Sequence, residues 1–188
     1  MKKLAIIMFF MIIALVVAGP AAAKVSEETA ECLECHTEGT MGIVKQWSDS
    51  NHWNAGVGCY ECHMADKKDK DAMKHNGFTI SIIVSPRDCG RCHEAETAEQ
   101  EASHHADAGN ILNSADALLG QTLGGPPAVN VGCKQCHGSD VIVNKDGSLD
   151  PSTWPNTGIG RINPDGSKGS CSACHTRHRF SKEQARKP

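Results

Sequence analysis

The sequence predicts a mainly α-helical fold with extensive loops, in which bound groups take the place of much of an apolar core. Aromatic residues make up only 4% of the 188, and the chain has 18 glycines and 8 prolines, so side chains alone build a thin core. The best helical stretch is residues 95–120, which is rich in alanine and glutamate. Ten cysteines recur at a repeated spacing along the chain. Together these features indicate short helical segments organised around something other than apolar side chains.

The first 23 residues have the layout of a secretory signal peptide. Lys2 and Lys3 precede an apolar run at residues 4–17, and small residues up to Ala23 form a cleavage site. The alternative is an uncleaved membrane anchor, but the run is shorter than the roughly 20 residues that a spanning helix needs. Under either interpretation residues 24–188 lie outside the cytoplasm, so we expect a periplasmic or extracellular protein.

The chain without the signal peptide is acidic. Removing Lys2 and Lys3 from the 19 basic residues leaves 17 against 22 acidic ones, a net charge of −5 with neutral histidine. Nucleic-acid-binding domains normally carry a basic face, so we expect no nucleic-acid partner. An even number of cysteines in an exported chain would normally indicate disulfides, but their spacing argues otherwise.

The ten cysteines form five copies of the pattern Cys-x-x-Cys-His, with none left over. On a helical turn, residues three apart share a face, so both thiols can bond to the two vinyl groups of one porphyrin. The histidine that follows then lies beneath the iron as its proximal axial ligand. The pattern predicts five covalently bound c-type haems (haem c) and a multihaem cytochrome c architecture. The attachment residues are Cys32, Cys35, Cys59, Cys62, Cys89, Cys92, Cys133, Cys136, Cys171 and Cys174, and the proximal ligands are His36, His63, His93, His137 and His175.

Other uses of paired cysteines fit the sequence less well. Zinc sites take two such pairs each, five pairs do not divide evenly, and zinc does not need a histidine after every second cysteine. A redox Cys-x-x-Cys motif usually occurs once, in a thioredoxin-like setting that is absent here. Disulfides within each pair are expected only before haem attachment.

Five histidines lie outside the motifs, at positions 52, 75, 104, 105 and 178. A low-spin electron-transfer haem takes a second axial ligand, commonly histidine or methionine, so these five could cap all five irons. Alternatively, one iron stays open and one spare histidine exchanges protons with a bound substrate. The count alone leaves both alternatives open.

The motifs divide the chain into residues 24–125, with the first three haems, and residues 126–188, with the fourth and fifth. We expect a serine- and asparagine-rich helix cap ahead of His52, a weak strand at residues 78–85, and a helix at residues 95–120 that ends at Gly120. Residues 141–170 are rich in glycine and proline. Their "KDGS" and "PDGS" units predict tight turns, and we expect this loop to fold over the fourth and fifth haems.

Several long stretches carry a family resemblance. "GTMGIVKQWSDSNHWNAGVGCYECH", "PPAVNVGCKQCHGSD", "DPSTWPNTGIGRINPDGSKGSCSACHTRHRFS" and the ending "ARKP" resemble the hydroxylamine oxidoreductase family of multihaem cytochromes, which includes hydrazine dehydrogenases and reductive relatives. The resemblance implies a mainly helical fold in which most haems have two histidine ligands and the fourth has an open iron that binds small nitrogen compounds. It places that haem at Cys133, Cys136 and His137. It also implies His178 as a catalytic residue and leaves His52, His75, His104 and His105 as distal ligands.

The chain also departs from this family. Family members typically carry eight haems, whereas this sequence ends after the fifth motif, as the N-terminal part of the usual chain would. Oxidative members tie the catalytic haem to a tyrosine from the C-terminal part, often from a neighbouring subunit of a trimer. The one tyrosine here, Tyr60, lies inside the second motif, so this chain alone does not form that cross-link.

Two functions therefore remain as expectations. In the first, an exported cytochrome couples electron transfer to redox conversion of hydroxylamine, hydrazine or nitrite at the fourth haem. In the second, the protein is a non-catalytic five-haem carrier with every iron six-coordinate, so enzymatic activity is left open. The expected partners are cytochromes or quinone-linked membrane proteins, with a homo-oligomer such as a trimer, or association with a missing C-terminal portion, as further possibilities.

Overall fold

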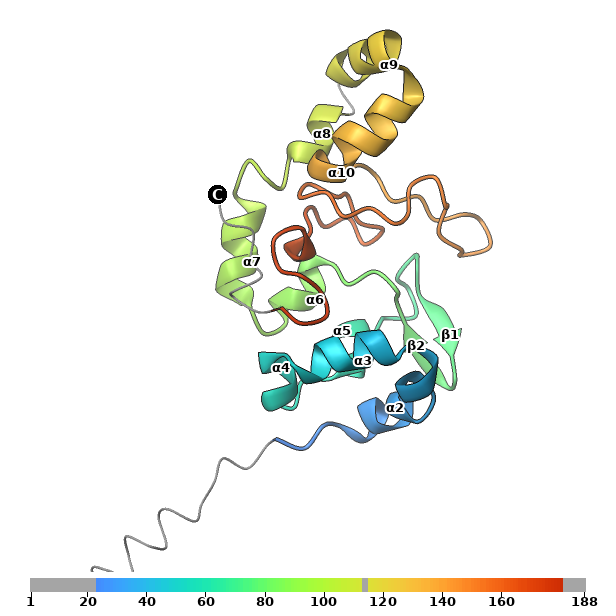
Figure 1. The fold of residues 1–188 in the computed structure, drawn as a ribbon, viewed down its shortest axis with the longest axis vertical. Helices are drawn as coiled ribbons and strands as arrows, with labels where there is room; N and C mark the ends of the chain where they lie inside the picture. Colours follow the sequence, from blue (N-terminus) through green and yellow to red (C-terminus); the bar gives the residue numbers. More distant parts are fainter. Residues whose placement is uncertain (1–22, 113–114, 181–188) are drawn as a thin grey trace, which may run out of the picture.

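The computed structural model describes residues 23–112 and 115–180, so residues 1–22 of the predicted signal peptide lie outside it. Short helices joined by long loops make up the structure, as predicted (Figure 1). No helix within these two described ranges is long and apolar enough to cross a membrane. The elements are α2 (Glu27–Gly39), α3 (Met41–Ser48), α4 (Asn51–Asn54), α5 (Cys59–His63), β1 (Met73–His75), β2 (Phe78–Ile80), α6 (Pro86–Gly90), α7 (Glu94–Glu101), α8 (Ala108–Leu112), α9 (Ala115–Pro127), the π-helix η1 (Ala128–Cys133), α10 (Lys134–His137) and the 3₁₀ turn η2 (Cys171–Ala173).

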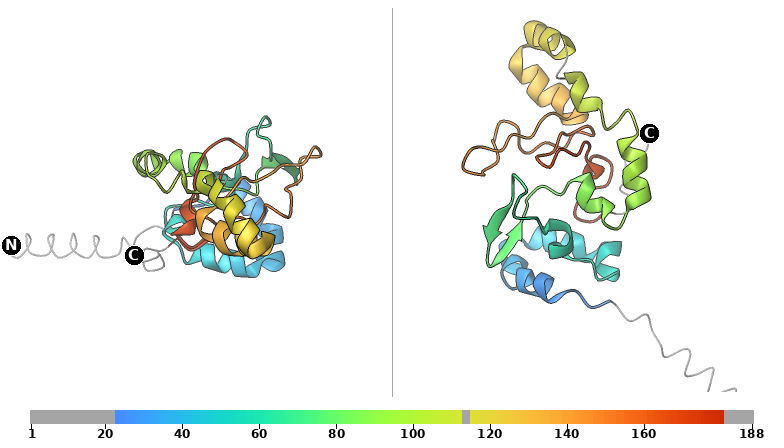
Figure 2. Two further views of the ribbon diagram at one scale, coloured as in Figure 1. Left: turned by 90° about the horizontal axis from the view of Figure 1, so that it is seen from above. Right: turned by 180° about the vertical axis from the view of Figure 1, so that it is seen from behind.

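The elements are arranged along one long axis. Helix α2 lies at one end and α9 at the other, and the long loop of residues 138–170 returns from α10 to α6 (Figure 1). The view from behind shows the same order, with η2 beside α6 (Figure 2, right). Strands β1 and β2 form an antiparallel hairpin in which His75 pairs with Phe78. Chain segments that carry different motifs are therefore neighbours in space.

Serine side chains begin several of the short helices. Ser26, Ser50 and Ser85 each accept a hydrogen bond from a backbone N–H in the first turn, with donor–acceptor distances of 3.1 Å in all three cases. A hydroxyl at this position satisfies a backbone donor that has no partner within the helix. The expected cap ahead of His52 is confirmed at Ser50. Of the strand expected at residues 78–85, only Phe78–Ile80 forms, and Ser85 at its expected end is the N-cap of α6.

The helix expected over residues 95–120 is broken, which corrects the prediction. Helix α7 ends at Glu101, and residues 102–107 form turns before α8 begins at Ala108. Ser103 donates its Oγ to the carbonyl of Gln100 at 2.6 Å, a local bond that competes with helix continuation. Gly120 does not end a helix, because α9 continues past it; a Cβ at Gly120 would lie 3.2 Å from Val129 Cγ2, so its absence allows close packing.

The loop of residues 138–170 contains the same tight turn twice. Asn-Lys-Asp-Gly-Ser at 144–148 and Asn-Pro-Asp-Gly-Ser at 163–167 both have a glycine with φ of 84°. In each turn the aspartate Oδ1 accepts from the serine N–H and Oγ, at 3.0 and 2.7 Å in the first turn and 2.8 and 2.6 Å in the second. The first turn is exposed, whereas Asn163 and Ser167 of the second are buried. The predicted turns are confirmed.

Glycines let this loop lie directly on the helices that precede it. A Cβ at Gly158 would collide with the backbone of Gly138, and one at Gly160 with the backbone of α8 at Gly109. The loop backbone then donates to the end of the fourth motif, from Ile159 N to Cys136 O and from Gly160 N to His137 O, both at 2.9 Å. Positions 158 and 160 therefore require glycine, because a side chain at either one would prevent this close backbone contact.

The protein core is thin, as predicted, and it is largely polar. The large apolar side chains buried among the described residues include Trp47, whose Nε1 donates to Val57 O at 3.0 Å, and Ile83. Several polar residues are buried in the loop of residues 138–170, where their side chains form hydrogen bonds with one another and with the backbone. Large apolar residues such as Leu123 and Val131 are instead 80% and 71% exposed. Side-chain packing alone therefore does not organise this fold.

Thr29 joins the first motif helix to the second. Its buried hydroxyl donates to Glu61 Oε2 at 3.0 Å and accepts from Tyr60 N at 3.2 Å. We expect Thr29→Val to lower the free energy of unfolding by about 1–3 kcal/mol, because the isosteric change removes both bonds of a buried hydroxyl and leaves Tyr60 N without this acceptor. Urea unfolding of the haem-loaded protein measures this. Thr37→Val, on the exposed side of the same helix, is the control, and equal losses in the two variants would contradict the assignment.

The twin turns allow a second matched comparison. We expect Ser167→Ala to cost about 1–2 kcal/mol, because Asp165 and Asn163 lose a buried partner, and Ser148→Ala to cost less, because water replaces the same bonds. Thermal unfolding of both variants tests the difference. A larger loss for Ser148→Ala would show that burial does not decide the strength of this turn.

Candidate haem-binding site

The five motifs share one backbone feature despite their different helix types. The first lies within α2 and the second forms α5, whereas the fourth runs from η1 into α10. In the third and fifth, the histidine N–H donates to the carbonyl of the first cysteine at 2.9 Å, from His93 to Cys89 and from His175 to Cys171. All ten cysteines lie in the described ranges, and none of them is paired in a disulfide there. Each motif therefore closes one turn that places its two thiols together.

The first motif faces the β-hairpin. The rings of His36, in α2, and His75, in β1, have centroids 6.0 Å apart. His36 Nδ1 lies 3.0 Å from Thr40 Oγ1. This bond leaves the other nitrogen, Nε2, available for a metal.

The third motif faces α4. The centroids of the His93 and His52 rings are 6.1 Å apart, and Phe180 packs edge-on against His52 at 5.4 Å. Burial, with His93 nearby, lowers the pKa of His52. A neutral imidazole is the form that binds a metal.

The second motif faces the C-terminal segment. His63 and His178 have ring centroids 6.4 Å apart and near-parallel planes. His63 Nδ1 lies 2.8 Å from the carbonyl of Ser81, and His178 N donates to Gln46 Oε1 at 3.2 Å. Burial, followed by the proximity of His63 and Arg177, lowers the pKa of His178 to about 4, so its ring is neutral at physiological pH.

The spacing of these three ring pairs fits an iron between them. Metal–imidazole bonds are about 2 Å long, so two imidazoles on opposite sides of one metal have centroids roughly 6 Å apart. The observed distances of 6.0, 6.1 and 6.4 Å agree with this value. Each pair contains one motif histidine and one spare histidine. The donors therefore fit c-type haem at the first three motifs.

Thiols of successive motifs are close enough to interact. Burial, with Cys32 nearby, raises the pKa of Cys59 to about 11, which places the first motif beside the second. Cys62 of the second motif is close enough to Cys89 of the third to raise the pKa of Cys89. A hydrogen bond with Cys171, and then burial, raise the pKa of Cys89, so the third and fifth motifs are in contact. The attachment points form a continuous series of first, second, third and fifth motifs.

The fourth and fifth motifs differ from the others. His137 Nδ1 is buried and has no hydrogen-bond partner within the described part of the chain, and no ring there faces His137 or His175. Within the described residues, the ring of His178 contacts His63 and not His137, the proximal histidine of the fourth motif. His104 and His105 are exposed in the turns at residues 102–107. In those turns Asp107 pairs with Lys168 at 2.6 Å, close to the fifth motif.

Apolar side chains near the motifs are exposed. Val131 precedes Cys133 by two residues, Met64 follows His63 directly, and Ile82 follows Ser81, with exposed fractions of 71%, 39% and 49%. A porphyrin attached at the adjacent cysteines has apolar faces that such side chains can cover. This arrangement agrees with the expectation that cofactors contribute to the core.

Arg91 is a structural contact that sequence reasoning did not identify. It occupies a variable position inside the third motif, and its Nη2 donates to Glu61 O in the second motif at 2.8 Å. The partners of His36 and His63, Thr40 and Ser81, were missed as well. Such bonds depend on residues distant from the motif or in its variable positions, so the sequence carries no signal for them.

Comparisons with known proteins agree with this geometry. A family model described as "Cytochrome c554 and c-prime" matches residues 17–64, which contain the first two motifs. A solved structure titled "Hypothetical multiheme protein" superposes with a TM-score of 0.78 at 32% identity, over 89% of this chain. The chain spans 42% of the length of that protein. With the five repeated motifs and the paired histidine rings, these likenesses identify the chain as a multihaem c-type cytochrome that carries covalently bound haem.

Proposed function

We propose that this chain binds five haems, four with two axial histidines for electron transfer and one, at the fourth motif, with an open iron. One observation carries the proposal: three motif histidines face a spare histidine at the spacing of a shared metal, whereas no ring in the described residues faces His137. When bound, the haems supply electron transfer and, at an open iron, redox conversion of a small nitrogen compound such as hydroxylamine, hydrazine or nitrite.

The ring contacts support specific distal ligands. We assign His75 to the first motif, His178 to the second and His52 to the third. His178 is therefore proposed as an axial ligand instead of the catalytic residue that the family resemblance implied. Its neutral, half-buried ring suits a metal ligand, because a proton donor at neutral pH needs a pKa much nearer 7.

The fifth motif has two candidate ligands. His104 and His105 lie just ahead of Asp107, whose ion pair with Lys168 attaches the turn at residues 102–107 to the chain before Cys171. Because of this proximity, we propose that one of these two histidines caps the fifth iron. The other of the two is proposed not to bind the fourth iron, whose distal side stays open.

The chain holds the backbone of the fourth motif in place, but the His137 ring lacks the Nδ1 contact that His36 and His63 make in the first two motifs. Backbone bonds from Ile159 and Gly160 hold the carbonyls of Cys136 and His137, and α8 packs on α10. His137 Nδ1 donates to no protein acceptor in the described residues, unlike the Nδ1 atoms of His36 and His63, which lie beside oxygen atoms. A proximal histidine without such a bond is less basic, which distinguishes this site from the first and second motifs.

The cellular setting remains a proposal from the sequence. The signal-like residues 1–23 favour export to the periplasm or beyond, where c-type haems serve redox partner cytochromes or quinone-linked membrane proteins. A homo-oligomer or a further polypeptide with additional haems would fit the same function.

Removing His178 tests the ligand assignment. We expect His178→Ala to convert one low-spin haem to a high-spin form, because the second motif loses its distal nitrogen. Electron paramagnetic resonance and the visible spectrum of the haem-loaded variant measure this. Arg179→Ala, in the same segment but exposed, is the control. Unchanged spin states in His178→Ala would refute the axial role.

Ligand binding tests the open iron. We expect the haem-loaded protein to bind one cyanide or nitric oxide per chain, with hydroxylamine perturbing the same component of the visible spectrum. Four haems should be unaffected because two histidines already occupy their axial positions. Five haems that remain low-spin and unreactive would overturn the catalytic proposal in favour of a pure electron carrier.

A further inference from the structure

Arg161 is a charged side chain that the loop of residues 138–170 buries almost completely, with 1% of its surface exposed. Its guanidinium donates from Nε to Asn163 Oδ1 at 2.6 Å, from Nη1 to Asn156 O at 3.3 Å and from Nη2 to Val84 O at 2.9 Å. All three acceptors are uncharged. A buried cation normally has an anionic partner, so this arrangement calls for an explanation.

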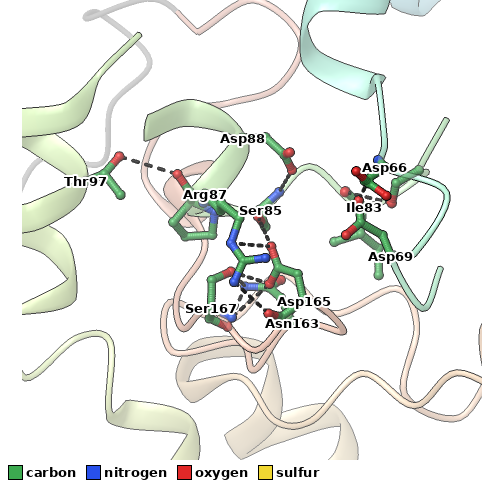
Figure 3. Close-up of polar contacts among 12 residues, drawn as sticks. Asp66, Asp69, Ile83, Ser85, Arg87, Asp88, Thr97, Asn163, Asp165 and Ser167 are labelled. Atoms are coloured by element: carbon green, nitrogen blue, oxygen red, sulfur yellow. Dashed lines mark hydrogen bonds and ion pairs between the residues drawn. The ribbon is translucent and has the colours of Figure 1, made fainter. Parts of the chain in front are cut away.

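The surrounding charges do not neutralise Arg161. No carboxylate in the described ranges lies within 4.0 Å of its guanidinium, and Arg177 adds a like charge nearby. Asp165 interacts electrostatically with Arg161 from a longer distance. The Asp165 carboxylate is shared with other groups, because it accepts hydrogen bonds from Ser85 at 2.6 Å and from Ser167 and faces Arg87 (Figure 3). Burial and then Arg177 lower the pKa of Arg161 to about 10, so it keeps its charge at neutral pH.

The charge lies between two attachment sites. Val84, which accepts from Nη2, precedes α6 and the third motif, and Gly169, whose N–H donates to Arg161 O at 2.6 Å, precedes the fifth. Cys89 and Cys171, the first cysteines of these two motifs, are both within electrostatic range of the guanidinium. Arg161 therefore faces the two motifs that touch each other.

We propose that Arg161 raises the reduction potentials of the haems at the third and fifth motifs by holding a permanent positive charge in the dry interior between them. The inference rests on the proposed attachment of haem at these motifs. A nearby positive charge favours the iron state that carries the additional electron. Coulomb interactions are strong where water and salt do not screen them, so a buried guanidinium acts more strongly than an exposed one. Burial and nearby charge are recognised means by which a protein tunes a haem.

Removing the charge is the first test. We expect Arg161→Gln to lower the midpoint potentials of two haem components in a spectroelectrochemical titration, with the other components unchanged. Arg87→Gln is the matched control, because Arg87 lies beside the same third motif but its side chain is 62% exposed. Its removal should shift the potentials much less. No shift in Arg161→Gln, or an equal shift in Arg87→Gln, would overturn the proposal.

The opposite change gives a second test that does not depend on Arg161→Gln folding. Asp165→Asn removes the negative charge that offsets Arg161 and keeps an oxygen acceptor, so we expect the same two potentials to rise. Asp146→Asn, at the equivalent position of the exposed twin turn, should leave them unchanged. A lowered or unchanged potential in Asp165→Asn would refute the electrostatic role.

Counting the attached haems distinguishes a failure of the proposed haem attachment from a failure of the proposed role of Arg161. Mass measurement of the intact protein reports how many haems are attached to the wild type and to each variant. A wild-type chain without haem at the third and fifth motifs would contradict the proposed function itself. Full haem attachment with unaltered potentials in Arg161→Gln would contradict only the role of Arg161.

Discussion

Facing histidine rings are the constraint on which the arrangement of this chain depends. Each of the three observed pairs joins a motif to a segment distant in the sequence: the β-hairpin to α2, helix α4 to the third motif, and the C-terminal segment to α5. Two imidazoles that share one metal must keep a nearly fixed separation. A shared metal would thus hold each pair of segments at a set distance, in a chain whose apolar side chains form little core of their own.

Hydrogen bonds between polar groups also stabilise the fold. The loop of residues 138–170 has almost no regular secondary structure, yet its backbone groups and amide side chains bond one another through Asn156, Asn163 and Ser167. Buried loops are stable only when such groups find partners. Most of these groups are paired, although the buried Oδ1 of Asn156 has no partner in the described residues, and one loop contacts the third, fourth and fifth motifs together. The same polar interior lets a guanidinium remain charged beside two haem-attachment sites.

Local and long-range features differed in how well they could be predicted. The helix cap at Ser50 and the turns at residues 144–148 and 163–167 followed from short patterns, because serine caps and aspartate–glycine turns depend on neighbouring residues. The helix over residues 95–120 was wrong because helix propensity took no account of the Ser103 bond and the Asp107–Lys168 ion pair, which shape the turn between α7 and α8. The catalytic role expected for His178 rested on its position after the fourth motif in the sequence, whereas in space it lies against the second.

The sequence by itself determined that five Cys-x-x-Cys-His motifs are present, and it predicts haem attachment and a proximal histidine at each, because attachment uses residues within a single turn. The five motifs can therefore be read without any knowledge of the fold. Only the tertiary structure decided which spare histidine faces which motif, that Arg161 is buried between the third and fifth motifs, and that His137 has no facing ring in the described ranges. These features depend on contacts between segments far apart along the chain, and no local pattern encodes them.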